Sequence, residues 1–260
     1  MFFYQYIIIL LATFIAGLVD SIGGGGGLIS LPAYLFIGLP PDSAVLCNKF
    51  SASCGTTFST LNFLKSKLIK LKTGLASVPM SFLGAQFGMR LALSLEPLLL
   101  KTLLFVILPF VGIFMLVKKD IGDQDMSSTL SKRKSIILSC IIGGLIGFYD
   151  GLFGPGTGTF AIIAYSYFMK YDARHAAGNA KLLNLTSNYS SLAVGLFSDK
   201  IIYSVAVPAA LTGIAGSFIG SYLAIKKGKK IIRPMMLFVV LLLFINLFYY
   251  LFNIFVIRVQ

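Results

Sequence analysis

Charged residues are scarce in this sequence, and hydrophobic residues are abundant. Of the 260 residues, 12% are Asp, Glu, Lys or Arg, whereas 57% are hydrophobic, and the mean hydropathy is +0.89. A soluble globule of this length needs more polar side chains to cover its surface. The composition therefore excludes an ordinary soluble domain and predicts an integral membrane protein.

Acidic residues are the scarcer charged class, because nine Asp and Glu stand against 22 Lys and Arg and leave a formal net charge of +13. In a soluble protein, this excess would suggest nucleic acid as a partner. Here the basic residues cluster in short segments between apolar runs, which is the pattern of membrane topology. We therefore expect the lipid bilayer, and no nucleic acid, as a partner.

Motifs for catalysis or metal binding are also lacking. The three cysteines, Cys47, Cys54 and Cys140, form neither a CxxC motif nor a metal-ligand spacing. No Gly-Lys-Ser/Thr follows the glycine clusters described below, which excludes a nucleotide loop. No serine, cysteine or carboxylate arrangement resembles a hydrolytic site. The sequence therefore predicts a protein that is not an enzyme and that carries no metal or cofactor.

Apolar runs dominate what is present. Several approach the roughly 20 residues that a helix needs to cross a bilayer, while two shorter runs, 28–39 and 157–169, each follow a glycine cluster. We predict an all-α polytopic membrane protein in which each short run and its predecessor form a broken helix or re-entrant hairpin. The runs are 2–22, 28–39, 44–64, 74–93, 98–117, 135–153, 157–169, 176–197, 201–225 and 234–257.

The two glycine clusters are copies of one pattern. The first starts at Gly17 and contains five consecutive glycines, 23–27, and the second spans 147–158. A glycine break at membrane depth survives only where protein or a water-filled cavity surrounds the freed backbone, so two matched breaks point to a substrate site. At one constant offset, Asp20 corresponds to Asp150, Gly24 to Gly154 and Gly26 to Gly156.

The correspondence extends over both halves of the chain. It predicts two homologous transmembrane repeats of about four helical segments each, residues 1–117 and 135–260. A cytoplasmic linker, 118–134, rich in charge and serine, joins them. The further corresponding positions are Lys49 with Lys181, Gly84-xxx-Gly88 with Gly216-xxx-Gly220, and Lys101-Thr102 with Arg233-Pro234.

Loop charge favours inverted repeats over parallel ones, because cytoplasmic loops carry the excess of Lys and Arg. Parallel halves, in which each glycine-broken pair crosses once, would divide the basic residues more evenly. Inverted halves, in which each pair returns to its starting face, leave only Lys200 and Arg258 in outside loops and put both termini outside. The number of Lys and Arg residues on each side is the same whether or not the first arm of each hairpin crosses the bilayer fully. An inverted arrangement of ten segments, five in each half, is therefore an alternative. The cytoplasmic residues are then Lys65, Lys67, Lys70, Lys72, Lys118, Lys119, Lys132, Arg133, Lys134, Lys170, Arg174, Lys226, Lys227, Lys229, Lys230 and Arg233.

The glycine clusters supply the first candidates for substrate binding. A helix that restarts after glycines places its amide ends and positive dipole near the middle of the membrane, where they attract an anion. Gly24, Gly25 and Gly26 let the backbone approach closely, and Gly156 and Thr157 are their counterparts in the second copy, with a hydroxyl donor added. Alternatively, the glycines only allow tight helix packing, which explains the two Gly-xxx-Gly motifs better than the five consecutive glycines.

Four ionisable residues lie inside apolar sequence, where such groups are unfavourable and usually functional. Lys49 and Lys181 suit the attraction of a small oxyanion; alternatively they form structural ion pairs, Lys49 with an aspartate of either half. Asp20 and Asp150 are candidates for proton coupling, or they cap the turns by accepting backbone amides.

A polar stripe follows each glycine hairpin and is formed by Asn48 in the first half and by Asn184 and Asn188 in the second. Lys181 shares one helical face with Asn184 and Asn188, at spacings of three and four residues. A polar face in the membrane must point into the bundle, where it either binds substrate or bridges helices. We predict that these asparagines bind substrate.

Five motifs carry a family resemblance: Gly17-Leu-Val-Asp-Ser-Ile with the glycines up to Gly27, Asn48-Lys49, Gly147-Phe-Tyr-Asp-Gly-Leu-Phe-Gly-Pro155, Ala180-Lys-Leu-Leu-Asn-Leu-Thr-Ser-Asn188, and Lys230-Ile-Ile-Arg-Pro234. They resemble the TauE/SafE family, the sulfite exporter type, and most closely its YfcA-like bacterial branch. The resemblance implies a prokaryotic cytoplasmic-membrane transporter, from a family linked to export of sulfite, sulfoacetate and other sulfur-containing or small organic anions. Pro155 and Thr157 depart from a plain glycine run, so the resemblance does not imply equal roles for the two halves.

The sequence thus predicts a secondary transporter in the cell membrane that exports a small anion, sulfur-containing or organic, by alternating access. An anion channel is the first alternative, and a non-transporting membrane assembly partner is the second. A homo-oligomer is compatible with the sequence.

Overall fold

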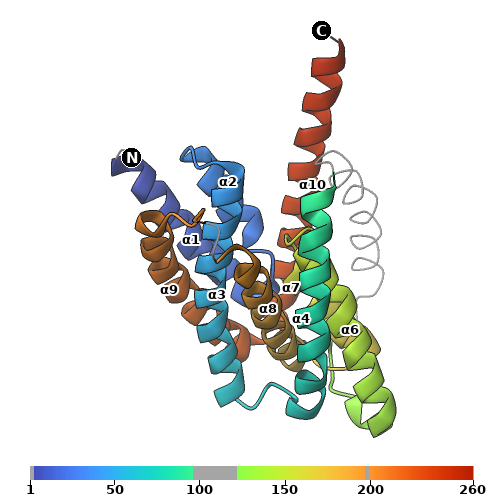
Figure 1. Ribbon diagram of the computed structural model, residues 1–260. Helices are drawn as coiled ribbons and strands as arrows, with labels where there is room; N and C mark the ends of the chain where they lie inside the picture. The colour runs from blue at the N-terminus through green and yellow to red at the C-terminus, as the bar shows by residue number, and fades with distance from the viewer. Residues whose placement is uncertain (1–2, 96–121, 197–198, 260) are drawn as a thin grey trace.

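The computed structural model describes residues 3–95, 122–196 and 199–259, and the long elements within these ranges are all α-helices (Figure 1). The all-α prediction is confirmed for these residues. A short 3-10 turn, η1 (Ser127–Thr129), lies in the linker. The helices are α1 (Phe3–Gly23), α2 (Gly27–Phe36), α3 (Pro41–Lys65), α4 (Leu71–Ser94), α6 (Lys132–Leu152), α7 (Thr157–Phe168), α8 (Ala173–Gly195), α9 (Tyr203–Lys227) and α10 (Lys229–Val259).

Each apolar run in the described ranges coincides largely with one helix. Several helices begin a few residues before the run, because polar residues cap their first turns: Ser131 accepts a backbone N–H at the start of α6, and Asp172 accepts two at the start of α8. With the broken pair α6–α7 counted as one segment, the described part of the second half contains four helical segments, the last of them α10. The predicted run 98–117, the repeat boundary at 117 and the start of the linker lie outside the described residues.

Among the described residues, α1, α6 and α9 are long and apolar enough to cross a membrane. Their outward faces are apolar, and the side chains of Leu11, Leu145 and Leu211 are each more than half exposed. Contiguous exposed apolar surface of this kind is unfavourable in water and marks contact with lipid or protein. The helices and the composition together identify an integral membrane protein.

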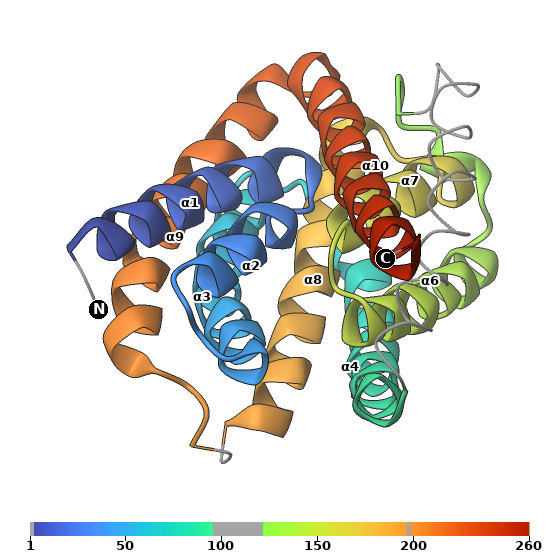
Figure 2. The ribbon, with the colours of Figure 1, turned by 90° about the horizontal axis from the view of Figure 1, so that it is seen from above.

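The two halves of the chain interlock. Helix α1 of the first half packs along α9 of the second, and α4 packs along α6 (Figure 2). Small residues allow this close approach: a Cβ on Gly216 would collide with the carbonyl oxygen of Phe14, and one on Gly84 with that of Gly144. The Gly-xxx-Gly motifs are therefore helix-packing motifs, as the sequence indicated.

The predicted helix breaks are present in both halves. The chain leaves α1 at the first glycine cluster and restarts as α2, and it leaves α6 at the second cluster and restarts as α7. Gly24 and Gly154, which occupy corresponding positions in the two glycine clusters, both have a φ of +82°. This left-handed conformation is easily adopted by glycine alone. The backbone therefore turns at equivalent positions in the two glycine clusters.

Helices α3 and α8 lie between the α1–α9 pair and the α4–α6 pair (Figure 2). They carry both candidate lysines into the interior, where Lys49 is 7% exposed and Lys181 is fully buried. A buried ammonium group is strongly unfavourable unless a counter-charge and hydrogen bonds compensate for the lost water. The fold therefore has to supply partners for both lysines.

Candidate functional site

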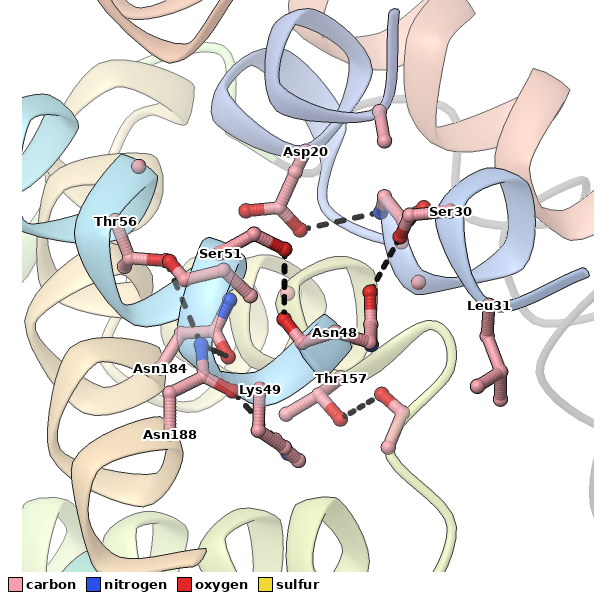
Figure 3. Close-up of a pocket in the computed structure, with 18 of the residues that line it drawn as sticks. Asp20, Ser30, Leu31, Asn48, Lys49, Ser51, Thr56, Thr157, Asn184 and Asn188 are labelled. Carbon is pink, nitrogen blue, oxygen red and sulfur yellow. Dashed lines mark hydrogen bonds between the residues drawn. The ribbon is translucent and has the colours of Figure 1, made fainter. Parts of the chain in front are cut away.

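A cavity of about 120 Å³ lies between the two glycine tips and the central helices (Figure 3). A polar space of this size can hold several water molecules or one small polyatomic anion. Leu31, Val45 and Phe153 provide apolar wall, and polar groups form much of the rest. The predicted site residues that line the cavity are Gly25, Gly26, Asn48, Lys49, Thr157, Asn184 and Asn188, together with Asp20 and Asp150.

Two crossed ion pairs join the halves at this cavity. Lys49 Nζ of the first half lies 3.2 Å from Asp150 Oδ2 of the second, and Lys181 Nζ of the second lies 2.6 Å from Asp20 Oδ2 of the first. Corresponding residues thus exchange partners across the boundary between the halves. The ion-pair alternative for the lysines is present in the structure, and Asp150 is the aspartate that Lys49 contacts.

Each aspartate also holds the start of the helix that follows its glycine cluster. Asp20 Oδ1 accepts the backbone N–H of Gly26 at 3.2 Å, and Asp150 Oδ1 accepts the hydroxyl of Thr157 at 2.8 Å. The capping alternative is therefore present for Asp20, whereas Asp150 accepts a side-chain hydroxyl and no backbone amide in the described contacts. The protein's own carboxylates occupy the positions where the two helix dipoles favour negative charge.

The two glycine tips touch each other. Thr159 Oγ1 in α7 donates a hydrogen bond of 2.6 Å to the carbonyl oxygen of Gly23. Gly24 and Gly158 are pressed together so closely that a Cβ on either would collide with the backbone of the opposite tip. The glycines thus serve this contact as well as the cavity wall.

Three predicted substrate-site residues lie behind the wall, because they are not among the cavity-lining residues of the described chain. Gly24 takes part in the tip contact, Gly156 faces the side chain of Leu243 on α10, and Lys181 lies behind its partner Asp20. Their part in substrate binding stays a prediction. Of the three, Lys181 pairs with Asp20 and Gly24 contacts Gly158, and both of these partners line the cavity.

The asparagine stripe converges on Lys49. Asn188 Oδ1 accepts a hydrogen bond of 3.1 Å from Lys49 Nζ, and the Asn188 amide nitrogen lies 3.4 Å from both Thr56 Oγ1 and Asn184 Oδ1. On the opposite side, Asn48 Oδ1 accepts the hydroxyl of Ser30 at 2.6 Å. These contacts orient the amide groups around the cavity (Figure 3).

The formal charges of the two pairs cancel, because two ammonium groups face two carboxylates. The cavity therefore offers no unbalanced positive charge to an anion. Attraction of an oxyanion by Lys49, as predicted from the sequence, depends on how the Lys49–Asp150 pair responds when the anion arrives. Buried ion pairs of this kind are held together by geometry and hydrogen bonds as much as by charge.

The family model for the sulfite exporter TauE/SafE matches residues 9–247. The chain belongs to the TauE/SafE family. Curated relatives of this TauE/SafE protein include "Probable membrane transporter protein YfcA" of Escherichia coli K12, which is 31% identical over 89% of this chain and 85% of its own length.

Two further relatives have similar names. The "Probable membrane transporter protein" of Haemophilus influenzae is 34% identical over 85% of this chain and 86% of its own. "Probable membrane transporter protein ORF9" of Sinorhizobium sp. is 34% identical over 94% of this chain and 93% of its own. No solved structure matches.

Sequence reasoning missed several lining residues of this TauE/SafE protein, among them Thr13 on α1 and Ser217 on α9. Thr13, Gly17 and Asp20 are spaced four and three residues apart on one face of α1, which would have indicated that Thr13 accompanies Asp20. No comparable signal marks Ser217. It faces the cavity because α9 packs on α1 through small residues.

A second polar cluster lies at the linker, away from the cavity. Lys70 Nζ lies 2.5 Å from Asp125 Oδ2, and His175 Nδ1 lies 2.7 Å from Asp172 Oδ2. Partial burial of Asp172 opposes its ionisation, but hydrogen bonds from the side chain and backbone of His175 outweigh burial and lower its pKa to about 2. Ligand atoms of Asp125, Asp172 and His175 lie within 4.8 Å of one another, which no spacing in the sequence revealed. These groups already bind each other and Lys70.

Proposed function

We propose that this protein is a secondary transporter that exports a small anion, sulfur-containing or organic, across the cell membrane by alternating access. The observation that carries the proposal is the cavity, with polar and ionisable groups in its wall, that lies between two broken helices of a membrane protein. Such midplane sites, built from helix breaks in two repeats, are typical of secondary transporters. The family's description as sulfite exporters and the relatives' names as probable membrane transporters support the same function.

We further propose that the halves are inverted repeats. In Figure 1, α1 runs downward from the N-terminus, whereas its counterpart α6 runs upward from the linker. Helix α3 likewise runs downward and α8 upward. The crossed ion pairs support this relation, because each lysine meets the aspartate of the other half. Rocking of one inverted half against the other is the motion by which such transporters alternate access.

Both chain ends lie at the upper end of the molecule in Figure 1. Lys65 at the end of α3 and Lys132 at the start of α6 belong to the lower end. Because basic residues favour the cytoplasmic side, we place the lower end in the cytoplasm and both termini outside.

A carrier fits the site better than a channel does. A channel needs a continuous polar path, whereas contact between Gly24 and Gly158 closes the space between the tips. For an anion that crosses without a proton, the membrane potential is a sufficient driving force, since moving one negative charge outward across about 100 mV gains roughly 2.3 kcal/mol. Asp20 and Asp150 are the candidate groups for proton coupling, because both are ionisable residues that line the cavity.

Flux through the purified protein in proteoliposomes tests this function. Sulfite, thiosulfate, sulfoacetate and simple carboxylates are offered in turn. The proposal predicts that at least one shows saturable flux and accelerated exchange against the same anion inside. Linear, voltage-driven conductance would identify a channel instead, and no flux of any of these anions would support an assembly partner.

A further inference from the structure

The two crossed ion pairs are not equivalent. Lys49 and Asp150 both line the cavity, and 3.2 Å separates Nζ from Oδ2. Lys181 is fully buried behind the wall, and its Nζ lies only 2.6 Å from Asp20 Oδ2. An anion in the cavity can therefore reach the ammonium group of Lys49, whereas Asp20 stands between it and Lys181.

Lys49 has both a donor and space available for an anion. In the described contacts, its ammonium group donates to Asp150 and Asn188, which uses two of three N–H donors. Beside it, Gly154 leaves room for only a methyl-sized group, since a Cβ there would be in ordinary contact with the carbonyl oxygen of Asp150 at 3.6 Å and with Lys49 Nζ at 4.0 Å. The amide nitrogen of Asn48 borders the cavity on another side, 3.7 Å from a Cβ placed on Gly27. A small oxyanion next to Lys49 thus has donors around it.

The balance of charge at the cavity then decides whether the Asp150 carboxylate is protonated. The empty pair is neutral, but an anion bound at Lys49 adds a second negative charge within a few ångströms of Asp150. In a buried site this repulsion is poorly screened. Protonation of Asp150 removes it and leaves one ammonium group facing one anion. A proton on Oδ2, the oxygen that faces Lys49, becomes a donor to the anion, while Oδ1 keeps the hydrogen bond from Thr157.

We propose that one proton binds at Asp150 together with each anion at Lys49, while the Lys181–Asp20 pair stays intact as the permanent link between the halves. This inference rests on the proposed function. The charged and titratable groups that face Asp150 are Lys49 from α3, the adjacent Tyr149 on α6, and, across the cavity, Asp20 from α1 with its partner Lys181 from α8.

Coupling of one proton to each anion changes the driving force of transport. A monovalent anion that moves with one proton transfers no net charge, so the flux follows the anion and pH gradients and not the membrane potential, and the outward gradient of the anion then drives export. Because the two bindings are linked, each must strengthen the other by the same factor. The apparent affinity for the anion therefore falls as the pH rises, by up to tenfold per unit.

The test uses the full-length protein in proteoliposomes with radiolabelled methanesulfonate, a monovalent anion, as the probe. A pH gradient, acidic on the side of the anion, should drive uptake, and a potential imposed with potassium and valinomycin should leave it unchanged. A weakly buffered pH dye should report proton movement with the anion. Flux that follows the potential without proton movement would overturn this inference and leave the carrier standing. No saturable flux of methanesulfonate, sulfite, thiosulfate, sulfoacetate or simple carboxylates would overturn the proposed function and this inference with it.

Asp150→Asn sharpens the test, because asparagine imitates the protonated acid in shape and keeps an acceptor for Thr157. Methanesulfonate uptake by this variant should show no pH dependence of affinity and should respond to the membrane potential. Asp42→Asn is the matched control, since Asp42 forms an exposed ion pair with Lys200 away from the cavity. It should behave like the natural protein. Asp150→Asn with an unchanged pH dependence would contradict the proposal, and the wild-type measurements decide the matter if this variant does not fold.

Discussion

Lys49 in α3 and Asp150 in α6 form a buried ion pair, with 3.2 Å between Nζ and Oδ2, across the boundary between the two halves. Both residues also line the cavity. A ligand that changes this pair therefore acts at once on the cavity and on the contact between the halves. This is the relationship that the proposed mechanism, rocking of one half against the other, requires.

The Lys181–Asp20 pair should matter mainly for stability. Lys181→Met leaves Asp20 without its counter-charge, and breaking a buried pair in this way costs about 3–5 kcal/mol. The double variant Lys181→Met/Asp20→Asn should recover much of the loss, since no unpaired charge remains and the asparagine oxygen can still accept the Gly26 N–H. Thermal unfolding in detergent measures both. Equal unfolding temperatures for the single and double variants would argue against a structural ion pair.

The contact between the two glycine tips predicts that alanine is harmful to folding at Gly24 but not at Gly27. Gly24→Ala should destabilise the protein and abolish transport, because its Cβ would collide with the backbone at Gly158 and its φ of +82° disfavours alanine. Gly27→Ala is the matched control for folding, since its Cβ would meet only Asn48 Nδ2 at 3.7 Å. It should fold normally and bind anions several-fold more weakly, because the methyl group narrows the cavity. Unfolding temperature and anion affinity separate the two effects, and a stable, active Gly24→Ala would contradict the tip contact.

The cap of α8 predicts a pH-dependent contribution to stability. Asp172→Ala should lower stability at neutral pH by about 1 kcal/mol, because two backbone N–H groups lose their acceptor. The pKa of Asp172 falls from 3.8 to about 2 on folding, so its contribution is present above pH 4 and is lost as the pH falls toward 2. Asp172→Asn should keep the cap and lose this acid dependence. Unfolding temperatures of the natural protein, Asp172→Ala and Asp172→Asn at pH 7 and pH 3 measure this contribution. An identical loss of stability in acid for all three proteins would contradict a stabilising role of the ionised Asp172.

The helices and their breaks were predictable because each has a local cause. Apolar runs of membrane length and capping residues set the helices, while glycines in left-handed conformation set the turns, as at Gly24 and Gly154. The gathering of Lys49, the aspartates and the asparagines at one cavity was predictable because polar side chains inside apolar sequence must face one another, whereas Lys181 lies outside the cavity lining. These signals lie within short stretches of sequence.

Which residues contact one another across the two halves was not predictable, because these contacts depend on how the halves pack together. The sequence left open which aspartate Lys49 contacts, and only the packing of α3 against the second half brings Asp150 to it. The approach of Asp125 to His175 likewise depends on where the linker lies. The cavity position of Ser217 depends on the α1–α9 contact. These are contacts between distant segments, which local patterns do not specify.

The most direct measurement of the central claim is anion binding to purified Lys49→Gln, compared with the natural protein and with Lys200→Gln. Lys200 is the matched control because its ion pair with Asp42 is exposed and lies outside the cavity. Calorimetric titration with sulfite, methanesulfonate and sulfoacetate should show that Lys49→Gln loses at least tenfold in affinity for the anion that the natural protein binds, since a charge-assisted hydrogen bond contributes about 1.5–3 kcal/mol. Lys200→Gln should bind as the natural protein does. Equal affinity in Lys49→Gln would contradict the account, because the anion would then bind elsewhere.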